Sequence, residues 1–128
     1  MDPALAERLR ARMGTSVEVV EGDAARMPFG DGRFSAVVCF TMLHHVPSVR
    51  QQDDLLREAK RVLRPGGVFA GLDSLPRWKV RLIHLFDTMV PVDPATFPSR
   101  LDRAGFQGAT VDAERTRFRF RAYAPGPP

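Results

Sequence analysis

The sequence predicts an α/β protein, because apolar strand-like segments alternate with amphipathic helical segments along most of its 128 residues. Phe34 to Phe40 is a nearly continuous apolar run, which is typical of a strand buried on both faces. Residues 48–63 then carry one apolar stripe at helical spacing, and Val68 to Leu72 are expected to form the next strand. This connection is too long for a hairpin and favours a right-handed parallel crossover.

One helix and one short strand are expected before that unit. Asp2-Pro3 is typical of a helix start, with an acidic N-cap and proline at the first helical position. Apolar residues recur at helical spacing over residues 5–13, and Gly14 is a natural stop. Residues 17–20 (V-E-V-V) indicate a short strand.

The middle helix has clear start and stop signals. Ser48 and Gln51 form a capping-box pattern at its beginning. It ends at Arg64-Pro65-Gly66-Gly67, where the two glycines permit backbone conformations that a side chain would disfavour.

The last third of the chain is less regular. Residues 78–90 are expected to form a helix, and the three prolines within residues 91–98 imply a loop. A short helix ending at residues 103–105 precedes two strands, 109–114 and 117–123, which are expected to pair as a hairpin. In the second strand arginines alternate with Phe, Phe and Ala, which predicts one solvated and one buried face.

Composition bounds the class of protein. The length suits one domain, and 44% hydrophobic with 27% charged residues is ordinary for a globular chain. The single cysteine, Cys39, excludes an internal disulfide framework and fits a reducing compartment as an inert buried thiol. No apolar run approaches the ~20 residues that a membrane span needs, and residues 1–13 lack a signal-peptide pattern. The cytoplasm is the expected compartment.

The net charge of +4 first suggests a nucleic-acid partner. Residues 1–76 are balanced, with ten Lys/Arg and ten Asp/Glu, so the whole excess lies in the last 52 residues. Most of the cations are arginine in a chain that is also rich in alanine, glycine and proline, a bias that coding composition produces as readily as a phosphate-binding surface. Nucleic-acid binding is therefore the minority interpretation.

Polar residues follow the predicted strands where ligands bind in open α/β sheets, outside the carboxyl ends of parallel strands. These ends are Gly22-Asp23-Ala24, Thr41 to His45, and Asp73-Ser74. Their convergence predicts a site at this edge of the sheet.

Four segments carry a family resemblance. Residues 21–29 (E-G-D-A-A-R-M-P-F), 34–46 (ending L-H-H-V), 56–67 (L-R-E-A-K-R-V-L-R-P-G-G) and 101–106 (L-D-R-A-G-F) resemble class I S-adenosylmethionine-dependent methyltransferases. The resemblance covers about residues 2–124 and implies S-adenosylmethionine as the cofactor.

The resemblance also implies roles for particular residues. Asp23 would accept a hydrogen bond from the adenine amino group, and the amide of Ala24 would meet the adenine ring nitrogen. Phe40 and Thr41 would lie near the methionine part of the cofactor. Leu43, His44, His45 and Val46 would line the methyl-acceptor pocket.

Each carboxylate also has a purely structural interpretation. Asp23 could cap the turn into Ala24-Ala25, and Asp2 is better explained as an N-cap than as a ribose ligand. Asp73 is either a pocket residue at the end of its strand or a turn residue.

The two adjacent histidines also have competing interpretations. His45 is a weak candidate for a general base, and a packing or hydrogen-bonding role competes with it. Adjacent residues such as His44 and His45 are expected to point apart, and no further ligand stands at metal-site spacing, so no metal is expected.

One family feature is absent from the sequence: no E/D-x-G-x-G-x-G loop, which would hold the far end of the cofactor, occurs anywhere. Residues 1–124 are therefore expected to form a partial methyltransferase domain, with residues 125–128 as a frayed tail. The fold predicted is a Rossmann-like sheet with an antiparallel final strand pair, incomplete (truncated) at its N-terminal side. Open sheet edges would favour a homo-oligomer or a second chain that completes the sheet.

The function implied is methyl transfer from S-adenosylmethionine to a small molecule, with the acceptor and the general base unknown. The alternative is a catalytically silent truncated paralogue, or an interaction module that completes a partner's sheet. Without the glycine loop, independent activity of this chain is in question.

Overall fold

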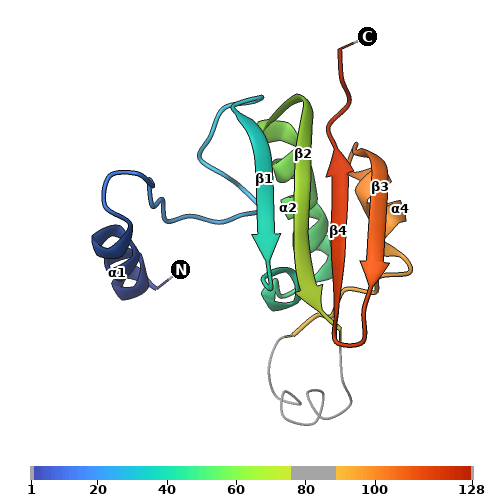
Figure 1. Cartoon of the computed structure of the whole chain (residues 1–128), viewed down its shortest axis with the longest axis horizontal. Coiled ribbons are helices and arrows are strands. Elements are labelled where there is room, and N and C mark those ends of the chain that lie inside the picture. Colours follow the sequence, from blue (N-terminus) through green and yellow to red (C-terminus); the bar gives the residue numbers. More distant parts are fainter. Residues whose placement is uncertain (1, 76–88, 128) are drawn as a thin grey trace.

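A computed structural model describes residues 2–75 and 89–127, in which one four-stranded sheet is the central element (Figure 1). The strand order is β1-β2-β4-β3, with β1 parallel to β2 and the other neighbouring pairs antiparallel. This arrangement confirms the α/β class and the antiparallel final strand pair. The elements in chain order are α1 (Pro3–Met13), β1 (Phe34–Phe40), the 3₁₀ turn η1 (Leu43–His45), α2 (Val49–Val62), β2 (Leu63–Ser74), α4 (Phe97–Arg103), β3 (Gln107–Ala113) and β4 (Arg117–Tyr123).

The helix starts follow the predicted capping pattern. Asp2 accepts a hydrogen bond from the Ala4 amide at 2.9 Å, and Ser48 Oγ accepts one from the Gln51 amide at 3.1 Å. Since these side chains satisfy amides that have no partner inside the helix, α1 and α2 begin where the sequence indicates.

The turn after α2 needs its glycines for two different reasons. Gly66 has φ +77°, whereas a Cβ on Gly67 would lie 2.9 Å from the carbonyl oxygen of Arg64. Strand pairing begins at Leu63, opposite Phe34, and resumes at Val68, opposite Ala36. β2 therefore starts five residues before the predicted strand and contains this turn as an irregularity.

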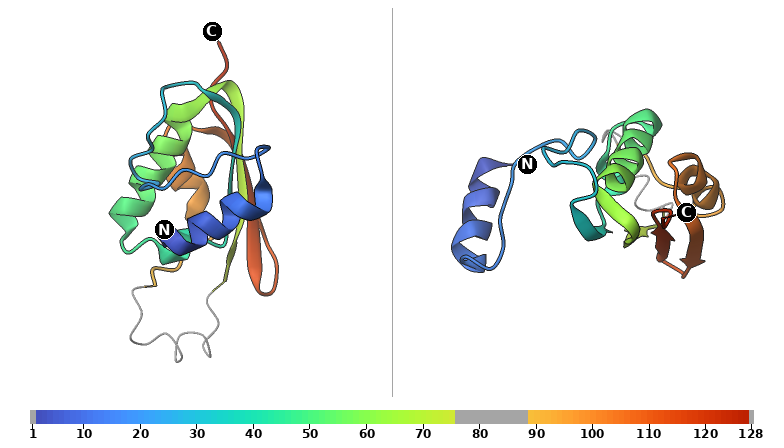
Figure 2. Two further views of the ribbon diagram at one scale, coloured as in Figure 1. Left: turned by 90° about the vertical axis from the view of Figure 1, so that its left-hand side faces the viewer. Right: turned by 90° about the horizontal axis from the view of Figure 1, so that it is seen from above.

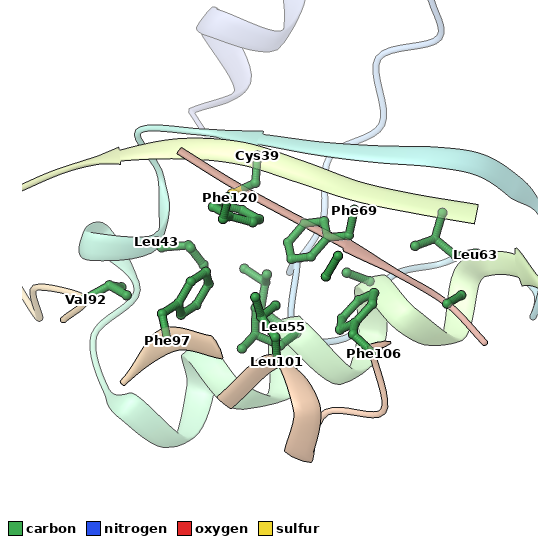
Figure 3. Packing of buried hydrophobic residues seen from close by; sticks show 14 of the residues in the cluster. Cys39, Leu43, Leu55, Leu63, Phe69, Val92, Phe97, Leu101, Phe106 and Phe120 are labelled. Carbon is green, nitrogen blue, oxygen red and sulfur yellow. The ribbon is translucent and has the colours of Figure 1, made fainter. Parts of the chain in front are cut away.

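One face of the sheet carries the core. Helices α2 and α4 lie on the same face, as the view from above shows (Figure 2). Phe69, Phe97 and Phe118 are fully buried there, and the ring of Phe97 lies 5.0 Å from that of Phe120 (Figure 3). Phe118, Phe120 and Ala122 point into this core while the arginines between them are exposed, which confirms the predicted faces of β4.

The opposite face is not covered by any described helix. Val38 and Phe40 on β1 are 61% and 60% exposed, so the expectation of a strand buried on both faces is wrong. The reason is that α1 lies apart from the sheet, beyond the open side of β1 (Figures 1 and 2).

The strand expected at residues 17–20 is also absent. A strand needs a neighbour for its amides and carbonyls, and no described strand lies beside this segment. The guanidinium group of Arg10 instead donates a hydrogen bond to the Val19 carbonyl at 3.1 Å.

Two expectations concern the segment between β2 and β3. Most of the predicted helix at 78–90 falls on residues 76–88, outside the described residues, and Met89 and Val90 are not helical. Pro98 lies within the first turn of α4 rather than in a loop, because proline fits an early helical position where its missing N–H costs nothing. Within the described ranges, no helix is long and apolar enough to cross a membrane.

Candidate functional site

An open hollow of about 930 Å³ lies where the turn around Asp23 faces the chain that leaves β1. Two of the three predicted strand-end segments border it. Its walls are largely apolar and come from four parts of the chain; they comprise Leu5, Gly22, Asp23, Ala24, Ala25, Met42, His45, Val46, Pro47, Gln51 and Leu55.

Asp23 and Ala24 sit together in this hollow. Oδ1 of Asp23 accepts a hydrogen bond from the Ala25 amide at 2.9 Å, and the Asp23 carbonyl accepts one from Arg26 at the same distance. Asp23 therefore does cap its own turn, as the structural interpretation expects. It remains solvent-exposed at the edge of the hollow, so capping does not remove it from the site.

Two residues of α2, neither of which the sequence analysis singled out, bind the loop that carries Asp23 by hydrogen bonds. Arg61 donates hydrogen bonds to the carbonyls of Met27 and Phe29 and to the Asp31 carboxylate. Glu58 accepts from the Met27 amide at 2.8 Å and from Arg61. The hydrogen bond from Arg61 holds the pKa of the Glu58 carboxyl below its usual value. The only sequence signal was an (i, i+3) pair of opposite charges on a helix.

Phe40 and Thr41 do not border this hollow. Phe40 lies on the uncovered face of the sheet, where it lines a second hollow of about 440 Å³ with Leu72 and Arg119. Thr41 has φ +49°, an uncommon conformation for a β-branched residue. Its amide donates a hydrogen bond to the Leu72 carbonyl at 2.9 Å. The predicted cofactor residues therefore fall into two groups in this structure.

The turn η1 is held from inside the protein. Gln52 is fully buried, and its Nε2 donates hydrogen bonds to the carbonyls of Leu43 and Val90 at 3.0 and 2.7 Å. The His44 carbonyl accepts from the Val90 amide. Leu43 is buried in the core, while His45 is exposed and borders the hollow.

His44 and Asp73 form a buried pair beneath that turn. Oδ2 of Asp73 accepts from the His44 amide at 3.1 Å, and Oδ1 bonds Nδ1 of the His44 ring. The rings of His44 and His45 lie 4.0 Å apart, so the expectation that they point apart is wrong. The tight 3₁₀ turn, unlike a strand, leaves adjacent side chains on neighbouring sides of the backbone.

Cys39 is buried on β1, as predicted. Burial and the nearby charge of Asp73 raise the pKa of its thiol to about 12, which leaves it protonated at neutral pH. Among the residues that the structure describes, no three His, Cys, Asp or Glu side chains gather as a metal site would require.

Comparison with known proteins decides the family. A family model described as a methyltransferase domain matches residues 1–71, more than half of the chain. The chain belongs to this methyltransferase family. The family is that of the class I S-adenosylmethionine-dependent enzymes, which confirms the resemblance and the predicted cofactor.

Sequence relatives of this methyltransferase chain differ in their named substrates. It is 37% identical to a demethylmenaquinone methyltransferase of Listeria welshimeri over 81 residues, which cover 60% of this chain and 33% of the relative. It is 42% identical to a fatty-acid O-methyltransferase of Mycolicibacterium smegmatis over 64 residues, 50% of this chain and 22% of the relative. The matched region is thus about a third or less of each relative.

Solved structures confirm the fold. A methyltransferase from Haloferax volcanii, solved in complex with the activator Trm112, superposes with a TM-score of 0.79 at 18% identity, covering 97% of this chain and 69% of that one. A methyltransferase structure from Bacillus halodurans gives 0.69 at 20% identity, covering 98% and 80%.

The residues of the hollow fit the adenine end of the cofactor better than its opposite end. The hollow offers an exposed carboxylate and a half-buried turn amide at Asp23 and Ala24, which suit an adenine edge. The glycine loop expected to hold the opposite end has no counterpart in the sequence.

Proposed function

We propose that this chain takes part in methyl transfer from S-adenosylmethionine to a small molecule. The observation that supports this most is the hollow itself, which brings Asp23, Ala24 and His45 together from segments that the family shares. When bound, the cofactor supplies an electrophilic methyl group on sulfur, and the protein's task is to bind, align and exclude water.

Asp23, Ala24 and the apolar walls of the hollow have separate tasks in this proposal. Asp23 accepts a hydrogen bond from the adenine amino group, and the Ala24 amide donates to the adenine ring. The apolar walls, with Leu5, Val46 and Leu55, suit an acceptor with a large apolar part. The two relatives named above act on a quinone precursor and a fatty acid, which have such a part.

Calorimetric titration of the full chain with S-adenosylhomocysteine tests the proposal. Asp23→Ala should weaken binding by about tenfold or more, since a single charge-assisted hydrogen bond is worth about 1.5 kcal/mol or more. Asp93→Ala is the matched control, because Asp93 caps a turn in the same way, accepting from the Ala95 amide at 2.9 Å, outside the hollow. If the folded wild type fails to bind, or if the two variants bind alike, the proposal is wrong.

A second candidate function is an interaction module that completes a partner's sheet. It is favoured by the uncovered apolar residues of β1 and by the pairing of β1 on one side only among the described strands. Such edges invite pairing with another chain. The Haloferax neighbour was solved with an activator protein, which makes a partner for this chain reasonable to test.

Light scattering over a range of concentrations tests pairing between copies of this chain. Val38→Lys places a charge on the exposed apolar face and should abolish any association that uses it. Association that Val38→Lys leaves unchanged would exclude this face as the interface. The cytoplasmic location remains a prediction.

A further inference from the structure

The face of the sheet opposite α2 and α4 (Figure 2) has an apolar half, formed by β1 and β2. Val38 and Phe40 point outward from β1, and both are more than half exposed. In the parallel register Val38 lies opposite Ala70, and Phe40 lies opposite Leu72. Because neighbouring strands are about 4.8 Å apart, the apolar half is about 10 Å wide, which is the width of one helix.

An arginine row on β4, formed by Arg119 and Arg121, borders this apolar half. Arg119 lies opposite Leu72 and Arg121 lies opposite Ala70, and both arginines are exposed. Alternate residues of a strand are about 6.8 Å apart, so the row runs parallel to the apolar half. The second hollow, of about 440 Å³, crosses the boundary, since both arginines line it together with Phe40 and Leu72.

Two carboxylates beside the arginine row restrict the kind of partner that fits. Asp112 on β3 lies opposite Arg119, and Glu114 in the hairpin turn forms ion pairs with Arg117 and Arg119. A nucleic-acid backbone or an acidic lipid surface is negative throughout, so it would meet these carboxylates with repulsion. A protein can place single carboxylates beside Arg121 and none beside Asp112.

We propose that the apolar half and the arginine row together form a docking surface for an amphipathic helix of another protein, with the apolar side of that helix on β1 and β2 and an acidic flank along β4. β2 and β4 each pair on both sides within the sheet, so contact with this face is made by side chains. Helical turns repeat every 5.4 Å, so acidic residues three or four positions apart reach both arginines.

The described helices of a second copy of this chain do not match that helix. α1 carries three arginines and one glutamate, so its charge opposes the arginine row. The apolar sides of α2 and α4 are already buried in the core of their own copy. The surface is independent of the proposed methyl transfer, and it uses the face of the sheet rather than the open edge of β1.

A synthetic peptide of about 18 residues, or five helical turns, tests the surface on the full chain. Leucines form one stripe of the peptide, and glutamates line both flanks of that stripe. A matched peptide carries lysine at each glutamate position. Fluorescence anisotropy should show saturable binding of the glutamate peptide, at least about tenfold tighter than that of the lysine peptide. Absent binding, or equal binding of the two peptides, overturns the proposal.

Three variants locate the binding. Arg121→Glu should weaken the glutamate peptide by about tenfold or more and strengthen the lysine peptide. Arg8→Glu, an equal change of charge at an exposed position of α1, should alter either affinity by less than about twofold. Phe40→Ala should weaken both peptides by about fivefold or more, because it removes an apolar contact. Equal effects of Arg121→Glu and Arg8→Glu would reduce the binding to general charge attraction and overturn the proposal.

The same variants distinguish other occupants of the face. Vesicles of phosphatidylglycerol and phosphatidylcholine that bind the wild type but not Arg121→Glu would assign the face to a membrane. Association of copies that Val38→Lys abolishes would assign it to a second copy. Either result overturns the proposal. Arg121→Glu should bind S-adenosylhomocysteine within about twofold of the wild type, so a failure of this proposal is distinct from a failure of the proposed function.

Discussion

The two faces of the sheet differ in what covers them, although the same strands form both. On the face covered by α2 and α4, Phe69 and Phe97 are fully buried (Figure 3), and so is Phe118. On the other face, Val38 and Phe40 of β1 are more than half exposed. Apolar residues on a strand therefore do not show that something covers them, since burial requires a helix or strand on that side.

The largest difference should appear when one phenylalanine is removed from each face. Phe118→Ala should lower the free energy of unfolding by about 3–5 kcal/mol, because it leaves a cavity in a packed core. Phe40→Ala should change it by less than about 0.5 kcal/mol, since this residue is 60% exposed. Urea denaturation of both variants measures this directly. Equal losses would mean that the outer face is covered in solution.

Gly71 on β2 tests how closely the backbones of β1 and β2 pack against each other. A Cβ on Gly71 would lie 2.0 Å from the carbonyl oxygen of Cys39 and 2.9 Å from the Phe120 ring. Gly71→Ala should therefore cost at least about 1–3 kcal/mol, through displacement of β1 or of that ring. Gly30→Ala is the control, because nothing lies within 4 Å of its added Cβ. A thermal shift that is the same for both variants would contradict the tight packing of β1 against β2.

A smaller, pH-dependent change in stability should report the hydrogen bonds that join the Asp23 loop to α2. The folded pKa of Glu58 is lowered, chiefly by the hydrogen bond from Arg61, so its stabilising effect is complete above the ordinary value of 4.5. The effect is lost as the pH falls through the lower folded pKa. Glu58→Gln should therefore lower the urea midpoint at pH 7, and the difference from wild type should shrink towards pH 3.

The exposed hairpin provides the control for this prediction. Glu114 pairs with Arg117 and Arg119 at the surface, and the hydrogen bond from Arg117 likewise lowers its pKa. Glu114→Gln should shift the midpoint less, because exposed ion pairs contribute little. A Glu58→Gln difference that is independent of pH would contradict the ion-pair explanation.

How much the sequence predicted depends on whether the signal was local. Caps such as Asp2 and Ser48, and the alternation of arginine and phenylalanine along β4, are properties of a few neighbouring residues and were predicted correctly. The burial of both faces of β1 and the strand at residues 17–20 depend on distant neighbours, and both predictions were wrong.

The candidate site divides in the same way. The motif around Asp23 was visible in the sequence. The structure adds the hollow and the hydrogen bonds from Arg61 to that loop. The pairing of His44 with Asp73 joins residues 29 positions apart, so no local pattern could have predicted it. Phe40, which the resemblance places near the cofactor, lines the second hollow on the uncovered face, and its assignment stays a prediction.

The central claim is that the hollow beside Asp23, rather than the uncovered face, receives the cofactor. Backbone amide NMR spectra of the full chain during titration with S-adenosylhomocysteine test it most directly. We expect saturable shifts at Ala24, Ala25 and His45, with little change at Val38, Thr110 and Arg121. Shifts centred on the second group, or none at saturating ligand, would contradict the claim.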